Sequence, residues 1–175
     1  MTKNLLTTTL LLFALVSIGV TQSINTSASL VTFEVNNMKF RTVEGSFDGM
    51  DGRLTFDQSN LELCEFDVCI DATTLKTGNS KRDNHLQQPD FFDTANHNQI
   101  CFVSDLIKPA NNGYAVVGQL DLKGISRSVM IPFTFDGTTF NGNLTLSRSD
   151  YGIGEGTNNF QIGDAISIQI KCVVN

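Results

Sequence analysis

The chain has few residues whose types and spacing would support catalysis or metal binding. Its two histidines, His85 and His97, form no recognised metal-binding motif, and Cys64 and Cys69 lack a second pair at metal-ligand spacing. The sequence also contains no Gly-x-Ser-x-Gly nucleophile motif and no phosphate-binding glycine loop. We therefore expect a protein that is not an enzyme and that carries neither a metal nor another cofactor.

The N-terminus has the outline of a secretory signal peptide. Lys3 precedes an apolar run over residues 10–20, and Thr21, Gln22 and Ser23 then end it. This run is shorter than the roughly 20 apolar residues that a spanning helix needs. We predict a signal peptide over residues 1–22, cleaved between Ser17 and Gln22, and a mature domain over residues 23–175. The mature protein would be periplasmic or secreted and would have no stable membrane anchor.

The net charge argues against nucleic acid and anionic membrane surfaces as partners. The chain has 12 basic and 18 acidic residues, so loss of Lys3 changes the net charge from −6 to 11 − 18 = −7. Such an acidic domain, without a basic cluster, is a poor candidate for binding nucleic acid or anionic membrane surfaces. Its length of about 150 residues is typical of one domain with a real core.

Alternating apolar and polar residues recur in eight short segments of the mature chain, which predicts eight half-buried strands. The apolar positions, segment by segment, are Val31, Phe33, Val35; Val43, Phe47, Leu54, Phe56; Cys64, Phe66, Val68, Ile70; Ile100, Phe102; Val116, Leu120, Leu122; Ile125, Val129, Ile131, Phe133, Phe135; Phe140, Leu144, Leu146; and Ile166, Ile168, Ile170, Cys172. In the second segment the apolar positions change from odd to even around Gly49 and Gly52, which predicts a bulge or a sharp bend. Eight strands with one apolar face each must close into a barrel or pack as a sandwich.

One short helix is expected in the long connection between the third and fourth strands. Asn79 can cap its first turn, and Pro89 stops it after residue 88. A connection of this length usually carries function or covers an opening. Phe91 and Phe92 follow, and because adjacent side chains point in different directions, one of them should anchor the connection to the core.

Parity divides the four cysteines into an inward and an outward pair. Cys64 and Cys172 share apolar strand faces, so we expect buried, reduced thiols. Cys69 and Cys101 face outward on the third and fourth strands. If these strands run antiparallel with Asp71 opposite residue 99, Cys69 lies opposite Cys101, within the distance that a disulfide spans. The alternative is two unpaired thiols, since the long connection does not fix the register.

Three stretches resemble the YceI family of lipocalin-like, polyisoprenoid-binding proteins. They are residues 77–86 (TGNSKRDNHL) with residues 90–93 (DFFD), residues 117–125 (VGQLDLKGI) and residues 146–154 (LSRSDYGIG). They occur in the family's order, and the resemblance covers essentially the whole mature chain. It implies an all-β fold, an eight-stranded antiparallel lipocalin-like barrel, often dimeric and periplasmic. The interior would hold a long apolar lipid such as an isoprenoid quinone or a polyprenyl phosphate.

We predict that binding, storage or transport of such a lipid uses the apolar interior of the barrel. The predicted interior residues are Phe33, Val35, Phe47, Phe56, Phe66, Val68, Ile70, Phe91, Phe92, Phe102, Val116, Leu120, Ile131, Phe133, Leu144 and Ile168. An eight-stranded barrel can also be filled by its own side chains. The alternative is therefore a non-catalytic structural or stress-related interaction module with a filled barrel.

The polar residues Arg82, Asp83, His85 and Arg148 allow two interpretations. In the structural one, Arg82 or Arg148 pairs with a nearby carboxylate and fixes the connection over the barrel mouth. In the functional one, Arg82, His85 or Arg148 donates a hydrogen bond to a ligand head group.

The chain also departs from the family pattern at three places. Ala28-Ser29 replaces a usual His-Ser pair, Asn36-Asn37-Met38 replaces a usual His, and Glu44 replaces a common basic residue. If those basic groups hold a charged head group in the family, their loss here favours a neutral lipid.

Overall fold

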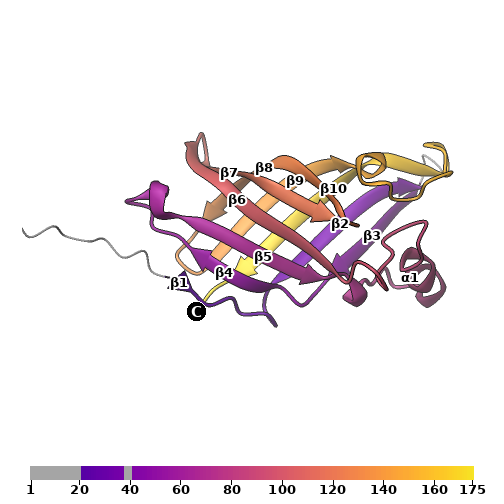
Figure 1. Cartoon of the computed structure of the whole chain (residues 1–175), viewed down its shortest axis with the longest axis horizontal. Coiled ribbons are helices and arrows are strands. Elements are labelled where there is room, and N and C mark those ends of the chain that lie inside the picture. Colours follow the sequence, from indigo (N-terminus) through magenta and orange to yellow (C-terminus); the bar gives the residue numbers. More distant parts are fainter. Residues whose placement is uncertain (1–20, 38–40) are drawn as a thin grey trace, which may run out of the picture.

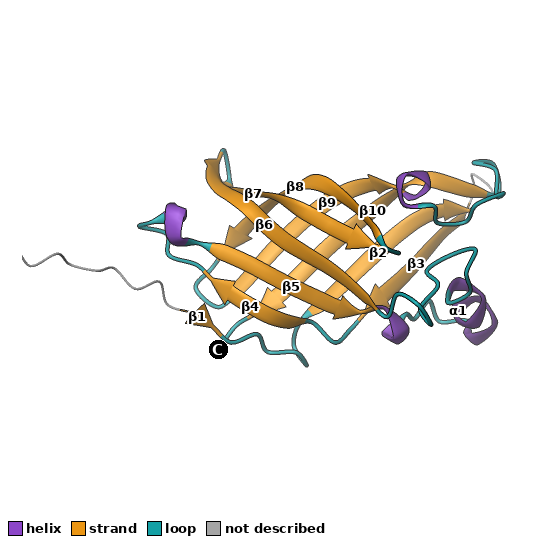
Figure 2. Cartoon of the chain, viewed as in Figure 1, coloured by secondary structure: helices purple, strands orange, loops and turns teal. Residues whose placement is uncertain are grey.

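The computed structural model describes residues 21–37 and 41–175, and most of this region forms one antiparallel sheet of ten strands (Figure 1). The sheet curls around an apolar interior as a half-barrel, and one α-helix lies at one end of it (Figure 2). The strand order is β1-β4-β5-β6-β7-β8-β9-β10-β2-β3. The strands are β1 Thr21–Gln22, β2 Leu30–Asn37, β3 Arg41–Phe47, β4 Asp51–Thr55, β5 Glu65–Asp71, β6 Gln99–Ala110, β7 Gly113–Leu122, β8 Ile125–Phe135, β9 Thr139–Ser147 and β10 Ile162–Val173. The helical elements are the α-helix α1, Ser80–Leu86, and the 3₁₀ turns η1 Leu61–Leu63, η2 Ala72–Thr74 and η3 Arg148–Tyr151.

The prediction of eight strands is wrong, because the structure has ten. Residues 43–55, predicted with Phe56 as one bent strand, belong to β3, β4 and the turn between them, and Phe56 follows β4. The chain turns at Gly49, whose φ of 74° lies in the left-handed region that favours glycine. Beyond this turn β4 leaves β3 and pairs with β5 instead. The remaining strand, β1, comes from Thr21–Gln22, which the prediction assigned to the signal peptide, and it pairs with β4.

Helix α1 lies within the predicted range of residues 79–88 and begins where expected. The Asn79 side chain accepts a hydrogen bond from the backbone N–H of Arg82 at 3.1 Å, as a capping residue does. The helix ends at Leu86, ahead of Pro89.

Phe91 and Phe92 both anchor the connection after α1, where only one was expected to do so. Both side chains are buried. The Phe92 ring lies 5.3 Å from the ring of Phe47 on β3. The Phe91 ring lies 5.0 Å from the His85 ring on α1.

The predicted register between β5 and β6 is present, with Asp71 opposite Gln99 and Cys69 opposite Cys101. The two cysteines form a disulfide across the outer face of the sheet. Cys64 and Cys172 are free thiols, as predicted, although only Cys172 is fully buried.

An aromatic cluster closes the end of the interior that lies away from α1. We call it the aromatic plug; its members are Phe56, Phe66, Tyr114, Phe133, Phe135 and Phe140. The Phe56 ring lies at its centre, between 5.1 and 6.1 Å from the other five rings. Mostly edge-to-face pairs of this kind each contribute about 0.5–1.5 kcal/mol beyond their buried area. The plug therefore makes this end rigid and solid.

Candidate ligand-binding cavity

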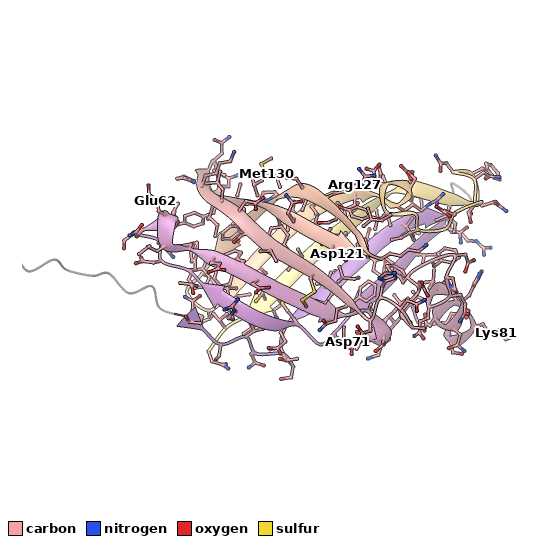
Figure 3. The ribbon with its side chains drawn as sticks, viewed as in Figure 1. Glu62, Asp71, Lys81, Asp121, Arg127 and Met130 are labelled. Atoms are coloured by element: carbon pink, nitrogen blue, oxygen red, sulfur yellow. A yellow bond between two sulfur atoms is a disulfide. The ribbon has the colours of Figure 1, made fainter. Side chains whose placement is uncertain are left out.

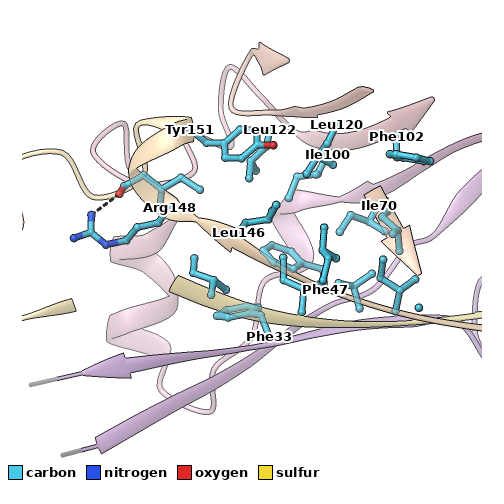
Figure 4. A pocket seen from close by; sticks show the side chains of 18 of the residues that line it. Phe33, Phe47, Ile70, Ile100, Phe102, Leu120, Leu122, Leu146, Arg148 and Tyr151 are labelled. Atoms are coloured by element: carbon cyan, nitrogen blue, oxygen red, sulfur yellow. Dashed lines mark hydrogen bonds between the residues drawn. The ribbon is translucent and has the colours of Figure 1, made fainter. Parts of the chain in front are cut away.

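A cavity of about 260 Å³ lies inside the curled sheet, between the aromatic plug and α1 (Figure 4). Every strand except β1 contributes to its wall, because alternate residues of each strand point to the concave face. Nearly all of the lining is aliphatic or aromatic. Side chains with an amide, hydroxyl or charged group are confined to Asn37, Arg82, Ser147, Arg148 and Tyr151.

Fifteen of the sixteen predicted interior residues line this cavity. They are Phe33, Val35, Phe47, Phe66, Val68, Ile70, Phe91, Phe92, Phe102, Val116, Leu120, Ile131, Phe133, Leu144 and Ile168. The exception is Phe56, which is buried in the aromatic plug and does not line the cavity.

Several wall residues keep solvent-accessible surface although they point inward. Ile100, Phe102, Leu120, Leu144 and Ile168 are only half-buried, and Figure 4 shows Ile100, Phe102 and Leu120 on the wall. In a close-packed interior such residues are almost completely buried. The side chains of this chain therefore leave the interior incompletely filled.

Some wall residues were not among the predicted interior positions. Met50 lies in the turn between β3 and β4, Leu86 lies on α1, and Tyr151 and Ile153 lie in and after η3. Alternation of apolar residues assigns faces only within strands, so it cannot place residues of turns. The only signal for Tyr151 and Ile153 was their position in residues 146–154, which resemble the family.

Tyr151 places an unused polar group at the cavity wall. Its side chain is 2% exposed, and its Oη is buried without a hydrogen-bond partner among the described residues. Burial raises the pKa of the phenol, so the hydroxyl stays protonated at neutral pH. The guanidinium carbon of Arg127 lies 6.0 Å from the ring centre.

Arg148 lines the α1 end of the cavity but directs its N–H groups into the loop that follows η3. The side chain is 4% exposed. Its Nε donates to the Gly163 carbonyl at 3.2 Å, and its Nη1 donates to the carbonyls of Ile153 at 2.8 Å and Gly154 at 3.2 Å. Its Nη2 donates to oxygens of residues 157, 159 and 162 at 3.0–3.2 Å.

The environment of Arg148 corrects the structural interpretation of this residue. No carboxylate forms an ion pair with it among the described residues; most of its acceptors are backbone carbonyls. The pKa of Asp164 is lowered chiefly by hydrogen bonds from Ser149, with a smaller effect of the Arg148 charge. All three nitrogens of Arg148 are engaged, so the guanidinium shapes the end of the cavity and has no free donor for a head group.

The remaining predicted polar residues lie around α1. Arg82 lines the cavity, and its Nε and Nη2 donate to the hydroxyl and the carbonyl of Thr77 at 2.7 and 2.8 Å. Asp83 accepts from the N–H of Thr77 at 2.9 Å and also from its hydroxyl. His85 contacts Asp90 at 3.0 Å on the exposed side of the helix. Neither Asp83 nor His85 lines the cavity.

The family departures also differ in their relation to the cavity. Glu44 lies opposite Glu34 and is exposed, so it does not face the interior. Ser29 is buried and donates to the Asn25 carbonyl at 2.8 Å. Asn37 lines the cavity and puts a neutral amide there, whereas Met38 lies outside the described residues.

Within residues 21–37 and 41–175, no three His, Cys, Asp or Glu side chains are grouped so that they could hold a metal ion. In the same ranges no helix is long and apolar enough to cross a membrane.

Relatives share both sequence and fold with this chain. A UPF0312 protein of Pseudomonas syringae pv. syringae (strain B728a) is 30% identical over 136 residues, which cover 71% of this chain and 71% of the relative. Protein YceI of Escherichia coli O157:H7 is 30% identical over 103 residues, 59% of this chain and 54% of that protein.

Solved structures superpose over most of their length. Burkholderia cenocepacia BcnA has a TM-score of 0.81 at 26% identity, covering 87% of this chain and 99% of its own. A Saccharophagus degradans domain, named as polyisoprenoid binding and implicated in plant cell wall breakdown, shares the fold with a TM-score of 0.65 at 16% identity, covering 88% of this chain and 97% of its own. The YceI-like domain family matches residues 22–174, and the protein therefore belongs to the YceI-like family.

Proposed function

We propose that this protein binds a slim apolar lipid, of isoprenoid type, in the cavity of the curled sheet and stores or carries it without catalysing a reaction. The observation that carries this proposal is the ring of inward-pointing but half-buried apolar residues around about 260 Å³ of unfilled space. Leaving a cavity of this size unfilled costs on the order of 6 kcal/mol at about 24 cal/mol per Å³. A ligand that fills it recovers part of that cost. The rival, a module with a filled interior, does not account for such a cavity.

The size of the cavity limits the ligand. Its volume lies just below the roughly 300–1,000 Å³ of typical small-molecule pockets. A short isoprenoid, or one segment of a longer quinone or polyprenyl tail, fits this space better than a whole long tail. The name of the Saccharophagus degradans domain supports the isoprenoid class.

The same curled sheet supports a lipocalin-like barrel. β3 and β4 are joined by the turn at Gly49, but they do not pair with each other among the described residues. The β3 end is held by the backbone pair of Ser46 with Lys76 in the connection before α1. We infer that this connection closes the barrel where the ladder is absent.

We further infer that the protein is exported. The predicted signal peptide lies almost wholly outside the described residues. Because Thr21 and Gln22 pair with β4, we place its cleavage before Thr21. The disulfide between Cys69 and Cys101 fits an oxidising compartment such as the periplasm. We still predict a homodimer, which sedimentation analysis would test.

The test is to purify the protein from its native compartment, extract it with organic solvent and identify the extract by mass spectrometry. We expect close to one apolar molecule per chain, and the delipidated protein should take up an isoprenoid alcohol. A native protein without extractable lipid, whose delipidated form binds no apolar chain, would favour the filled module instead.

A further inference from the structure

The hydrogen-bonded wall of the cavity is interrupted between β8 and β9. These strands pair only at Phe133–Gly142, Thr134–Asn141 and Phe135–Phe140 among the described residues, although β8 extends back to Ile125 and β9 on to Ser147. The ladder stops at Pro132, which has no N–H to donate. From that point the two strands run on without pairing to each other.

The strands are joined again at the far end of this opening. Arg127 on β8 donates from its Nε to the carbonyl of Asp150 in η3 at 2.7 Å. Lys123, in the turn before β8, donates to the Gly152 carbonyl at 2.7 Å. The opening is thus bounded at both ends, and we call it the β8–β9 window.

A surface groove lies over the window and meets the cavity. On β8 it is lined by Val129, Met130 and Pro132. On β9 and β10 it includes Leu144, Leu146 and Ile168, and these three residues also line the cavity. A single layer of residues therefore separates the interior from the groove here. Met130 is 56% exposed beside it (Figure 3).

Along the groove the rim of the window is polar and uncharged, and the cations Lys123 and Arg127 lie only at its end, where they donate to backbone carbonyls. Asn143 lies opposite Gln169, and Thr145 lies opposite Ser167, on the outer faces of β9 and β10. No Lys, Arg, His, Asp or Glu lines the groove. At the α1 end, in contrast, the polar groups of Arg148 are already engaged with the protein.

We propose that the β8–β9 window holds the polar end of the ligand, and that this end is an uncharged hydroxyl, carbonyl or amide group whose apolar tail reaches the cavity between Leu144 and Leu146. The proposal rests on the proposed function and specifies its head-group class. Hydroxyl and amide side chains can donate to or accept from such a group. A phosphate or carboxylate would find no cation in the groove to compensate its loss of hydration.

The test uses retinol, a fluorescent isoprenoid alcohol, and retinoate, the carboxylate with the same tail, on delipidated full-length mature protein. We expect wild type to bind retinol at least roughly tenfold more tightly than retinoate. Thr145→Lys puts an ammonium at the window rim and should strengthen retinoate binding roughly tenfold, the effect of one charge-assisted hydrogen bond. Retinol binding should not become tighter, and an unchanged far-UV circular dichroism spectrum reports a folded variant.

Two variants serve as controls. Thr134→Lys adds the same charge on β8 where the ladder with β9 is intact, and Asn37→Lys adds it at the α1 end of the cavity. Neither variant should strengthen retinoate binding. If Thr145→Lys does not fold, Ser167→Lys on the opposed residue replaces it.

The outcomes separate this proposal from the proposed function. A gain with Asn37→Lys would place the head group at the α1 end and overturn the proposal. Equal effects of Thr145→Lys and Thr134→Lys would overturn it too, as would wild type that prefers retinoate. Wild type that binds neither probe nor any other apolar chain would contradict lipid binding itself.

Discussion

Blocking the cavity with Leu120→Trp should abolish ligand binding while leaving the fold intact. Leu120 lies on β7, lines the cavity and is half-buried, so the larger ring enters unfilled space. Extra buried carbon contributes about 0.8 kcal/mol per methylene-sized group, against roughly 1–3 kcal/mol if the ring overpacks its neighbours. We therefore expect the free energy of unfolding of the ligand-free protein to change by no more than about 2 kcal/mol.

The effect on binding is measured as a thermal shift. A ligand at 100 times its Kd stabilises the folded state by about 2.7 kcal/mol, which raises the Tm of a domain of this size by roughly 5–10 °C. Wild type should show this shift with retinol, and Leu120→Trp should show little or none. The control is Gln119→Trp, at the exposed neighbouring position, which should keep the full shift.

The two variants also report their own environments, because the chain contains no other tryptophan. Emission from Trp at position 120 should be blue-shifted relative to position 119. A full thermal shift in Leu120→Trp, with its tryptophan demonstrably buried, would refute the assignment of the cavity as the binding site.

Three further predictions concern stability. Phe66→Asp replaces a buried ring, whose centre lies 5.6 Å from that of Phe133, with an unpaired carboxylate, and should lower the free energy of unfolding by at least about 3 kcal/mol; an unchanged urea midpoint would contradict the burial of Phe66. Cys69→Ser opens a covalent loop with a sequence separation of 32 and should cost about 4 kcal/mol, measured by non-reducing denaturation, whereas Cys64→Ser should cost clearly less. Burial raises the pKa of Cys172 from 9.0 to about 11, so the folded state keeps a proton that the unfolded state releases. Stability should fall between about pH 9 and 11, by up to about 3 kcal/mol, and fall less in Cys172→Ala.

The interior was predictable because strand alternation is a local property. A residue such as Leu144 or Ile168 faces the same side as residues two positions away, whichever strand lies beside it. The register of β5 and β6 was also predictable, because a disulfide between the two outward cysteines requires Cys69 to lie opposite Cys101. Phe56 follows the same parity, but it comes just after β4 ends, and there alternation no longer places a side chain on the cavity wall.

Features that depend on distant backbone could not be read from residue types. The expected carboxylate partner of Arg148 is replaced by carbonyls of a loop whose path only the fold determines. The β8–β9 window also depends on distant backbone and could not be predicted from the sequence. Pro132 is visible in the sequence, but the apolar alternation of β8 and β9 continues past it, and nothing local shows that the strands stop pairing. Gly49 suggested a bend, yet whether β4 stays beside β3 depends on its pairing with β5.

The two ends of the interior and its side wall differ in what must break for a ligand to pass. At the plug, passage would separate aromatic rings that pack against each other within about 6 Å. At the α1 end, it would displace the loop whose carbonyls accept from Arg148, and each hydrogen bond to a charged group contributes roughly 1.5–3 kcal/mol. Losing two of these hydrogen bonds would leave N–H groups of a buried cation without acceptors. At the β8–β9 window no ladder joins the strands, so only side chains such as Leu144 and Leu146 must move. Side-chain rotation of this kind takes less free energy than opening a hydrogen-bonded end, and we therefore expect a ligand to exchange through the side wall.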